Sequence, residues 1–453
     1  MPRGIRRTPA RPFSLRPAQL IVAGFAAAIL IGTALLSLGP ATAASGSAPF
    51  TTAAFTSVSA VTVTGLASVD TATYWSPFGQ AVILGLVQLG GLGIVTSASI
   101  LILVARRRVG LRGRLAAQAE VRSTGDLASL RRLTGFIIAF TFAVEAVVVI
   151  ALTLRLWLGL GRSFGQALWQ GLFHGVAAFN QAGFSLYSDN LVGFATDALI
   201  LVPIALAVIV GGVGFPVWLE LRRRPRAPSR WSIHTKLTLV TTLTLLALGF
   251  VVLTGLEWGN EATLGDDSAA GKLLGGFFAA VTARNAGFNA VDYADMGTDS
   301  LFVTDMLMFV GGGSASPAGG IKVTTLAIVF LIVWAELRGE REVAAFERAI
   351  PAATLRQALT VAVSALNAVV VATLILVASN DLGLSDALFE CVSAFSTTGL
   401  STGVTGSLDT AGEAILMILM FLGRVGPITL GVALMVRERE RLFNHPEERP
   451  IVG

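Results

Sequence analysis

The stretch Ser385–Leu400 reads SDALFECVSAFSTTGL, and its pattern decides the fold prediction. The expected helical part, Ser385–Thr397, is mildly apolar and ends in small and hydroxyl residues. It is too short to cross a membrane, because a spanning helix needs about 20 residues. A short apolar segment of this kind fits a re-entrant half-helix. Three further segments have the same character: Ala53–Val63, Phe164–Asn180 and Lys272–Ala283.

A short motif with glycine in its fourth position follows each half-helix. We call these motifs turn 1 (Thr62–Leu66, TVTGL), turn 2 (Asn180–Phe184, NQAGF), turn 3 (Arg284–Phe288, RNAGF) and turn 4 (Ser396–Leu400, STTGL). Their glycines lie 118, 104 and 112 positions apart, and near-constant spacing indicates an internal repeat. The order of elements is the same each time, which predicts parallel repeats around an axis along the membrane normal. The predicted repeats cover residues 1–115, 116–230, 231–350 and 351–453.

The composition agrees with a membrane protein. Hydrophobic residues make up 54% of the 453 residues and charged residues only 13%, against about a quarter in soluble chains. This excludes a cytosolic enzyme, a disordered chain and a secreted disulfide scaffold, and the lone Cys391 excludes a cysteine-based metal cluster. Eight spans are expected, near residues 18–39, 77–105, 134–160, 195–221, 236–257, 301–335, 357–379 and 411–436. The first is long enough to be a retained helix rather than a cleaved signal peptide.

Charged residues predict the orientation. The basic clusters are Arg3–Arg16, Arg106–Arg114, Arg222–Arg230, Arg338–Arg356 and Arg437–Arg449, whereas the opposite loops hold mostly acids. By the positive-inside rule both termini are cytoplasmic, and the half-helices enter from outside. The net charge of +5 then reflects arginines that face anionic membrane lipid, not a nucleic-acid partner.

Four parallel copies around one axis form a pore. The prediction is therefore an all-α polytopic membrane protein with four helix–pore-loop–helix repeats, eight full spans and four re-entrant half-helices around one central pore. Each half-helix would direct its carboxyl end, with its partial negative charge, at the pore centre and favour a cation. Carbonyl oxygens of the turns can replace the hydration shell of a monovalent cation, and glycine is needed because a Cβ would narrow the lumen.

The segment 301–335 is too long for one crossing, and a run of ten small residues interrupts it: Gly311, Gly312, Gly313, Ser314, Ala315, Ser316, Pro317, Ala318, Gly319 and Gly320. This run cannot continue a helix. It is either a kink for packing or a loop below the pore that blocks the path and moves on opening. A phosphate-binding loop is rejected, because Lys322 is one position out of register and the setting is a membrane helix.

Two basic residues lie in or near spans. A guanidinium within the membrane is costly and is usually functional or paired. Arg424 is therefore either a structural ion pair, for example with Glu413 or Glu145, or a positive charge facing the pore under the turns. Lys322 has the same two interpretations. Acids that follow the turn glycines by five or six residues (Asp70, Asp189 and Asp292) could raise the local cation concentration.

The chain resembles the Trk/Ktr/HKT superfamily of potassium transporters over nearly its whole length, and its length resembles KtrB-type membrane subunits. The most specific stretches are Thr62–Leu66, Ala178–Ser185, Arg284–Asn289, Ser396–Ser401, Gly311–Thr325 and Gly423–Pro427. The resemblance implies K⁺ bound by backbone carbonyls of a selectivity filter formed by Val63, Thr64, Gly65, Gln181, Ala182, Gly183, Asn285, Ala286, Gly287, Thr397, Thr398 and Gly399. It also implies that loop 311–320, with Lys322 and Arg424, acts as a gate.

The same resemblance implies a homodimer in the plasma membrane, gated by a cytosolic KtrA-like nucleotide-binding ring. No covalent cofactor is expected; K⁺ is the transported ion, and Na⁺ stays open as a coupling or activating ion. Relatives that favour Na⁺ often have serine at the first filter glycine, where this chain has Gly65. Two alternatives stay open: a Na⁺- or H⁺-coupled transporter with the same fold, and a membrane enzyme for lipid-linked substrates. The enzyme would need catalytic acids or histidines facing one membrane surface, and the sequence offers none.

Overall fold

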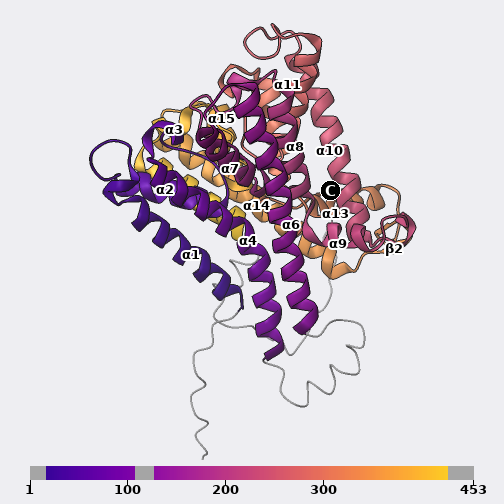
Figure 1. Cartoon of the computed structure of the whole chain (residues 1–453). Coiled ribbons are helices and arrows are strands. Elements are labelled where there is room, and N and C mark those ends of the chain that lie inside the picture. Colours follow the sequence, from indigo (N-terminus) through magenta and orange to yellow (C-terminus); the bar gives the residue numbers. More distant parts are fainter. Residues whose placement is uncertain (1–16, 108–126, 427–453) are drawn as a thin grey trace, which may run out of the picture.

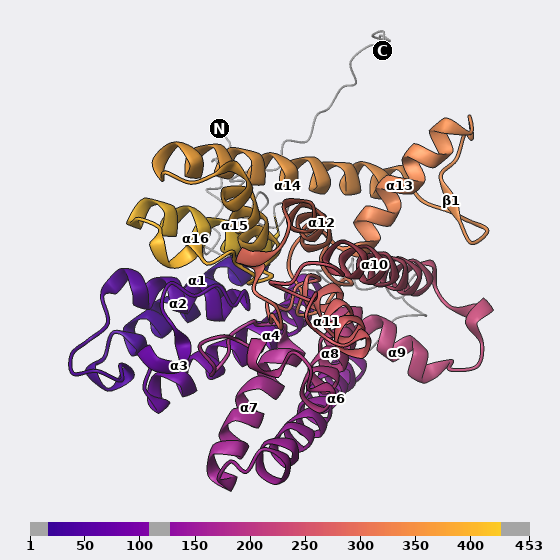
Figure 2. The ribbon, with the colours of Figure 1, turned by 90° about the horizontal axis from the view of Figure 1, so that it is seen from above.

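The computed structural model describes residues 17–107 and 127–426, which are mostly helical. Seen from above, successive parts of the chain follow one another around the centre of the molecule (Figure 2). The first part of the chain forms α1 (Pro17–Leu36), α2 (Phe50–Thr62), α3 (Thr71–Tyr74) and α4 (Pro77–Arg107). The next part forms α6 (Leu127–Leu154), a π-helical turn η2 (Arg155–Gly159), α7 (Phe164–Asn180), α8 (Ala198–Val213) and α9 (Phe215–Arg223).

The second half of the chain continues around the same centre (Figure 2), and Figure 1 shows the molecule from the side. It forms α10 (Ile233–Glu257), α11 (Ala269–Thr282), α12 (Thr298–Phe309) and α13 (Val323–Leu337). A two-stranded antiparallel hairpin, β1 (Ala344–Ala345) and β2 (Arg348–Ala349), leads to α14 (Ala352–Ser379), α15 (Leu384–Ser396) and α16 (Thr410–Val425). Short 3₁₀ turns connect the helices: η1 (Gly39–Ala41), η3 (Val192–Phe194), η4 (Pro228–Arg230), η5 (Tyr293–Asp295) and η6 (Val404–Ser407).

The four stretches predicted to be half-helices are helical and form α2, α7, α11 and α15, with 13, 17, 14 and 13 residues. Serine hydroxyls cap two of them: Ser163 accepts from Gln166 N, and Ser268 accepts from Gly271 N. Such caps satisfy backbone N–H groups that have no partner within the helix. The last turns of all four are buried, so these helices form the interior of the molecule.

Helices further out expose large apolar side chains. On α10, Leu243 and Val251 are 62% and 66% exposed, and on α14, Leu366 and Leu374 are 55% and 61% exposed. In water, an apolar surface of this extent would be a liability. Such an apolar surface is suited to contact with the hydrocarbon core of a lipid bilayer.

By length and composition, four helices within residues 17–107 and 127–426 can cross a membrane: Gln19–Leu36, Thr134–Gly159, Ile233–Glu257 and Ala352–Ser379. The bent pair α8 and α9 would add a fifth. Shorter apolar helices lie at Pro77–Gly93, Ala269–Thr282 and Val323–Leu337. The expected eight spans and fourfold repeat therefore stay predictions.

The predicted span 195–221 is not one continuous helix. The chain bends by 89° between α8 and α9. Gly214, between them, has a φ of 94°, which favours glycine, and Pro216 follows it at the start of α9. The amphipathic α9, which carries Glu220 and Arg222, therefore turns away from the axis of α8.

Two other predicted spans differ from the helices that the structure shows. The segment 301–335 is two helices, α12 and α13, with no helix between Phe309 and Val323, as its small residues predict. The span 411–436 appears as α16, which ends at Val425; residues from 427 onward lie outside the described residues. So do the basic clusters at 3–16 and 437–449, most of the cluster at 106–114 and the first predicted repeat boundary.

Candidate functional site: a ring of four glycines

The structure brings the glycines of the four turns together. They lie so close together that none of them has room for a side chain. A Cβ on Gly65 would collide with the backbone of Gly183, and a Cβ on Gly183 with the backbone of Gly287. A Cβ on Gly287 would meet Thr398 O and lie 3.1 Å from Gly399 Cα. A Cβ on Gly399 would meet Thr64 O and lie 3.1 Å from Gly65 Cα, which closes a ring. We call Gly65, Gly183, Gly287 and Gly399 the glycine ring.

The backbone before each ring glycine takes an unusual conformation. Val63, Gln181, Asn285 and Thr397 have φ values of 59°, 63°, 70° and 54°, in the left-handed region that residues with a Cβ rarely adopt. Such a conformation costs about 1–3 kcal/mol and persists only where the surroundings enforce it. All four residues are buried, with exposed fractions of at most 1%. Strained backbone in one buried place is typical of a functional site.

Turns 1 and 4 share one pattern of hydrogen bonds. The amide of Gly65 donates to Ser59 Oγ at 3.1 Å, and the amide of Gly399 donates to Ser393 Oγ at the same distance. The Thr62 and Thr64 hydroxyls lie 2.8 Å apart, and the equivalent hydroxyls of Ser396 and Thr398 lie at the same distance. Each turn is therefore supported by its own half-helix.

Turns 2 and 3 are supported by amide side chains that reach other parts of the chain. Gln181 Nε2 donates to Val208 O of α8 at 2.9 Å, and Asn285 Nδ2 donates to Ser396 O in turn 4. Before the ring glycine these turns have Ala182 and Ala286, which offer no hydroxyl. Their shape therefore depends on neighbouring elements.

Three supporting residues were not predicted from the sequence. Ser59 and Ser393 stand six positions before their glycines, a shared spacing that could have identified them. Asn190 lies beyond turn 2, and its Nδ2 donates to Gly183 O and Gly287 O at 3.4 and 3.5 Å. Only the fold brings Asn190 to two ring carbonyls, so no local signal marks it.

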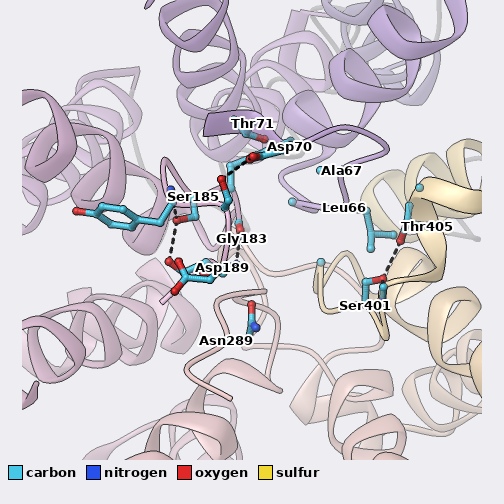
Figure 3. A pocket seen from close by; sticks show the side chains of 18 of the residues that line it. Leu66, Ala67, Asp70, Thr71, Gly183, Ser185, Asp189, Asn289, Ser401 and Thr405 are labelled. Atoms are coloured by element: carbon cyan, nitrogen blue, oxygen red, sulfur yellow. Dashed lines mark hydrogen bonds between the residues drawn. The ribbon is translucent and has the colours of Figure 1, made fainter. Parts of the chain in front are cut away.

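A polar vestibule of about 480 Å³ lies over the ring, and segments that follow all four turns line it (Figure 3). The predicted mouth acids Asp70, Asp189 and Asp292 all lie in its lining. Burial alone would raise the pKa of Asp70, but hydrogen bonds from the Ser188 and Thr73 hydroxyls and from Ala72 N lower it below the usual value. Asp70 therefore stays negatively charged in the vestibule.

Loop 311–320 packs against the turns. A Cβ on Gly319 would collide with the Thr397 side chain, and a Cβ on Gly311 would lie 3.1 Å from Asn285 Oδ1. The amide of Gly313 donates to Gly212 O of α8 at 2.7 Å. The loop is mostly buried, and glycine is required at these close approaches.

Three basic side chains donate hydrogen bonds to carbonyl oxygens of this loop. Arg424 binds Pro317 O, Lys322 Nζ binds Ala318 O at 2.5 Å, and Arg284 Nη2 binds Gly311 O at 3.3 Å. Arg424 also donates to Gly90 O of α4 at 2.6 Å. Three positive charges thus lie on the loop, and Arg284 was not among the predicted gate residues.

The ion-pair alternative for Arg424 is not what the structure shows. Within residues 17–107 and 127–426, Arg424 forms no salt bridge. The carboxylate of Glu145 accepts from Asn180 Nδ2 at 3.0 Å. Arg424 binds main-chain carbonyls instead of either acid.

Comparison with known proteins adds to this geometry. A family model described as TrkH, cation transport protein, matches residues 11–444. The chain belongs to this family. The predicted place in the Trk/Ktr/HKT superfamily is thereby confirmed.

Relatives within the family match almost end to end. The Ktr system potassium uptake protein B of Bacillus subtilis is 38% identical over 96% of this chain and 97% of its own length. The protein of the same name from Vibrio alginolyticus is 34% identical, over 96% and 94%. The potassium/sodium uptake protein NtpJ of Enterococcus hirae is 33% identical, over 97% and 98%. The named members are transport proteins, not enzymes.

A solved structure shares the fold. The crystal structure of the potassium transporter TrkH from Vibrio parahaemolyticus superimposes with a TM-score of 0.71 at 18% identity, over 95% of this chain and 87% of that chain. Family membership and the long apolar helices together identify a multi-pass membrane protein.

Proposed function

We propose that this chain conducts K⁺ across a membrane and that the glycine ring, with the residues before it in each turn, is its selectivity filter. The observation that carries this proposal is the mutual contact of four glycines from the ends of four short buried helices. The names of the relatives, potassium uptake proteins at 34% and 38% identity, support K⁺ as the ion. One relative named for both potassium and sodium keeps Na⁺ relevant as a competing ion.

The physical basis is the arrangement of partial charges. A helix carries about half a negative charge at its carboxyl end. The half-helices α2, α7, α11 and α15 all end next to the ring, so their partial charges would add where a cation sits. Carbonyl oxygens of the turns would replace the water lost by K⁺, and the absence of Cβ atoms lets the four backbones approach closely.

Loop 311–320 would act as the gate in this proposal. Its packing against turns 3 and 4 and the three basic side chains on its carbonyls support this role. A positive charge beneath the filter opposes long residence of a cation there. Opening would require the loop to exchange its bonds with Arg424, Lys322 and Arg284 for other partners.

The remaining parts of the proposal concern assembly. We expect a homodimer with one pore in each chain, residing in the plasma membrane with both termini in the cytoplasm. In each chain, the four predicted repeats would each supply one turn to the pore of that chain. A cytosolic KtrA-like nucleotide-binding ring would control the gate, an expectation that the Ktr names of the relatives support.

The test is K⁺ uptake by a cell that cannot grow on low K⁺, carrying this chain with and without a KtrA-like subunit. Growth and Rb⁺ uptake are expected with the intact chain and should be lost on Gly399→Asp, which places a side chain in the ring. Asp381→Asn, at an exposed acid outside the vestibule, is the matched control and should retain uptake. Equal uptake by cells with the parent chain and with Gly399→Asp would overturn the proposal.

A further inference from the structure

A small cavity lies behind turn 2, bordered by α8, α10, α11 and loop 311–320. The space open to the centre of a water-sized sphere is about 20 Å³. Its polar lining comes from Gln181, Thr242 and Arg284, and the rest is aliphatic side chains and glycine. The three residues are 1%, 6% and 8% exposed, so their polar groups do not form hydrogen bonds with bulk solvent.

Each of these side chains has one polar atom without a hydrogen-bond partner among the described residues: Gln181 Oε1, Thr242 Oγ1 and Arg284 Nε. Their other polar atoms are engaged. Gln181 Nε2 donates to Val208 O at 2.9 Å, while Arg284 donates to Thr242 O at 3.1 Å and to Gly311 O at 3.3 Å. These bonds fix the Gln181 amide so that its oxygen, an acceptor, is the free atom.

The three free atoms need complementary partners. Arg284 Nε is a donor, Gln181 Oε1 an acceptor, and the Thr242 hydroxyl can be either. A buried water needs about 10–15 Å³ of such space and two to four polar partners. A water molecule fits because it can accept from the arginine and donate to the amide oxygen, whereas an anion would be repelled by that oxygen.

We propose that this cavity binds one ordered water molecule, held by Gln181, Thr242 and Arg284, that joins turn 2 to loop 311–320. Its path runs from turn 2 through the water to Arg284 and on to Gly311 O. Thr242 is then a positioning residue that acts on the ion path only through the water.

The expected consequence for transport rests on the proposed function. Loss of the water would loosen turn 2 and also the Arg284 side chain that holds the loop. Ion selectivity and the fraction of open pores should therefore change together when Thr242 loses its hydroxyl. A purely structural threonine would change the stability of the protein but neither of these properties.

The first test is a structure of the full chain in lipid, at a resolution that shows waters, with a second data set in bromide. One peak within hydrogen-bond distance of all three atoms is expected, and it should be absent in Thr242→Val. An empty cavity in the parent protein, or a peak that scatters as bromide, would overturn the proposal. The result for the parent protein depends neither on ion flux nor on whether a variant folds.

The second test measures Na⁺ against Rb⁺ uptake by proteoliposomes. Thr242→Val should raise the ratio of Na⁺ to Rb⁺ uptake about fivefold, which corresponds to ~1 kcal/mol, the net contribution of one hydrogen bond. Thr242→Ser should keep the parent ratio. Thr254→Val is the matched control, because Thr254 lies on the same helix, is also 6% exposed with an unpartnered hydroxyl, and does not line the cavity.

The outcomes separate the two proposals. Equal ratios for Thr242→Val and Thr254→Val would contradict the role of the water in transport. A parent protein that takes up no Rb⁺ would contradict the proposed function, while the water peak would still decide the binding site.

Discussion

In turns 1 and 4 the bonds that fix the backbone are local, whereas in turns 2 and 3 they come from elsewhere in the fold. The amides of Gly65 and Gly399 each bind a serine hydroxyl six residues earlier. The two glycines have φ values of 93° and 94°, so the two turns match closely. Turn 2 instead depends on α8 through Gln181, and turn 3 on turn 4 through Asn285.

This difference teaches that similar backbone geometry can have two kinds of support. A turn whose bonds lie within one half-helix should tolerate changes elsewhere in the molecule. A turn tied to neighbouring elements should respond to movements of those elements. Turn 3 contacts loop 311–320 through Arg284 and Asn285, so a gate movement would reach it directly.

Substitution of ring glycines should separate the turns most strongly. Gly65 needs a positive φ, but Gly183 does not, although a Cβ at either would meet neighbouring backbone. Serine at Gly65 adds strain of about 1–3 kcal/mol to the steric conflict. Gly65→Ser should therefore raise Na⁺ permeation relative to K⁺ by at least tenfold, and Gly183→Ser by less. Relative permeabilities in reconstituted vesicles provide the measurement.

Gly399→Ser is the internal control for that prediction. Its φ matches that of Gly65, so the two variants should behave alike. If Gly183→Ser has the largest effect of the three, the backbone explanation is wrong. Unchanged permeability in Gly65→Ser would remove that glycine from the filter.

Release of loop 311–320 should change flux more than selectivity, because the support of turns 1 and 4 is local. Arg424→Ala removes the donors to Pro317 O and Gly90 O. Hydrogen bonds from charged groups contribute about 1.5–3 kcal/mol, so the open fraction should rise about tenfold or more. Single-channel or flux recordings test this, with Arg338→Ala, an exposed arginine, as the control. A folded variant with no flux would argue against a gate.

The local support of turns 1 and 4 can be removed directly. Ser59→Ala and Ser393→Ala each leave a glycine amide without its acceptor, buried at Gly65 and partly buried at Gly399, which costs about 1–3 kcal/mol. Both should lower K⁺ over Na⁺ selectivity severalfold and to the same extent. Ser57→Ala is the control, since that buried serine on α2 binds Ile29 O of α1 instead. Unequal effects at Ser59 and Ser393 would break the equivalence of turns 1 and 4.

Sequence could predict what depends on local pattern. The ring glycines follow from four similar motifs, and the broken helix after Phe309 follows from a run of small residues with Pro317. The bend at Gly214 also had a signal, because glycine and Pro216 interrupt an apolar run there. The length of that run outweighed it and led to one predicted span instead of two helices.

What the sequence could not predict depends on long-range contact. Arg424 binds a carbonyl 334 residues away, at Gly90, and no spacing rule identifies such a partner. The same holds for Asn190 at two ring carbonyls and for Arg284 at Gly311. An arginine in a membrane suggests an acid as its partner, yet main-chain carbonyls left free by an irregular loop serve equally well.

The smallest effect is expected at the vestibule, where Asp70 follows turn 1 and accepts from Ser188, just beyond turn 2. Hydrogen bonds keep the pKa of Asp70 below its usual 3.8, so its charge persists from pH 8 to pH 5 and is lost only as the pH falls through that lowered value. Its attraction for K⁺ should therefore be constant over this pH range. Asp70→Asn should slow uptake about threefold at low ionic strength and much less at 1 M salt, because exposed charges are screened. Initial rates at both salt concentrations test this; an effect that does not depend on salt would assign Asp70 to holding turns 1 and 2 together.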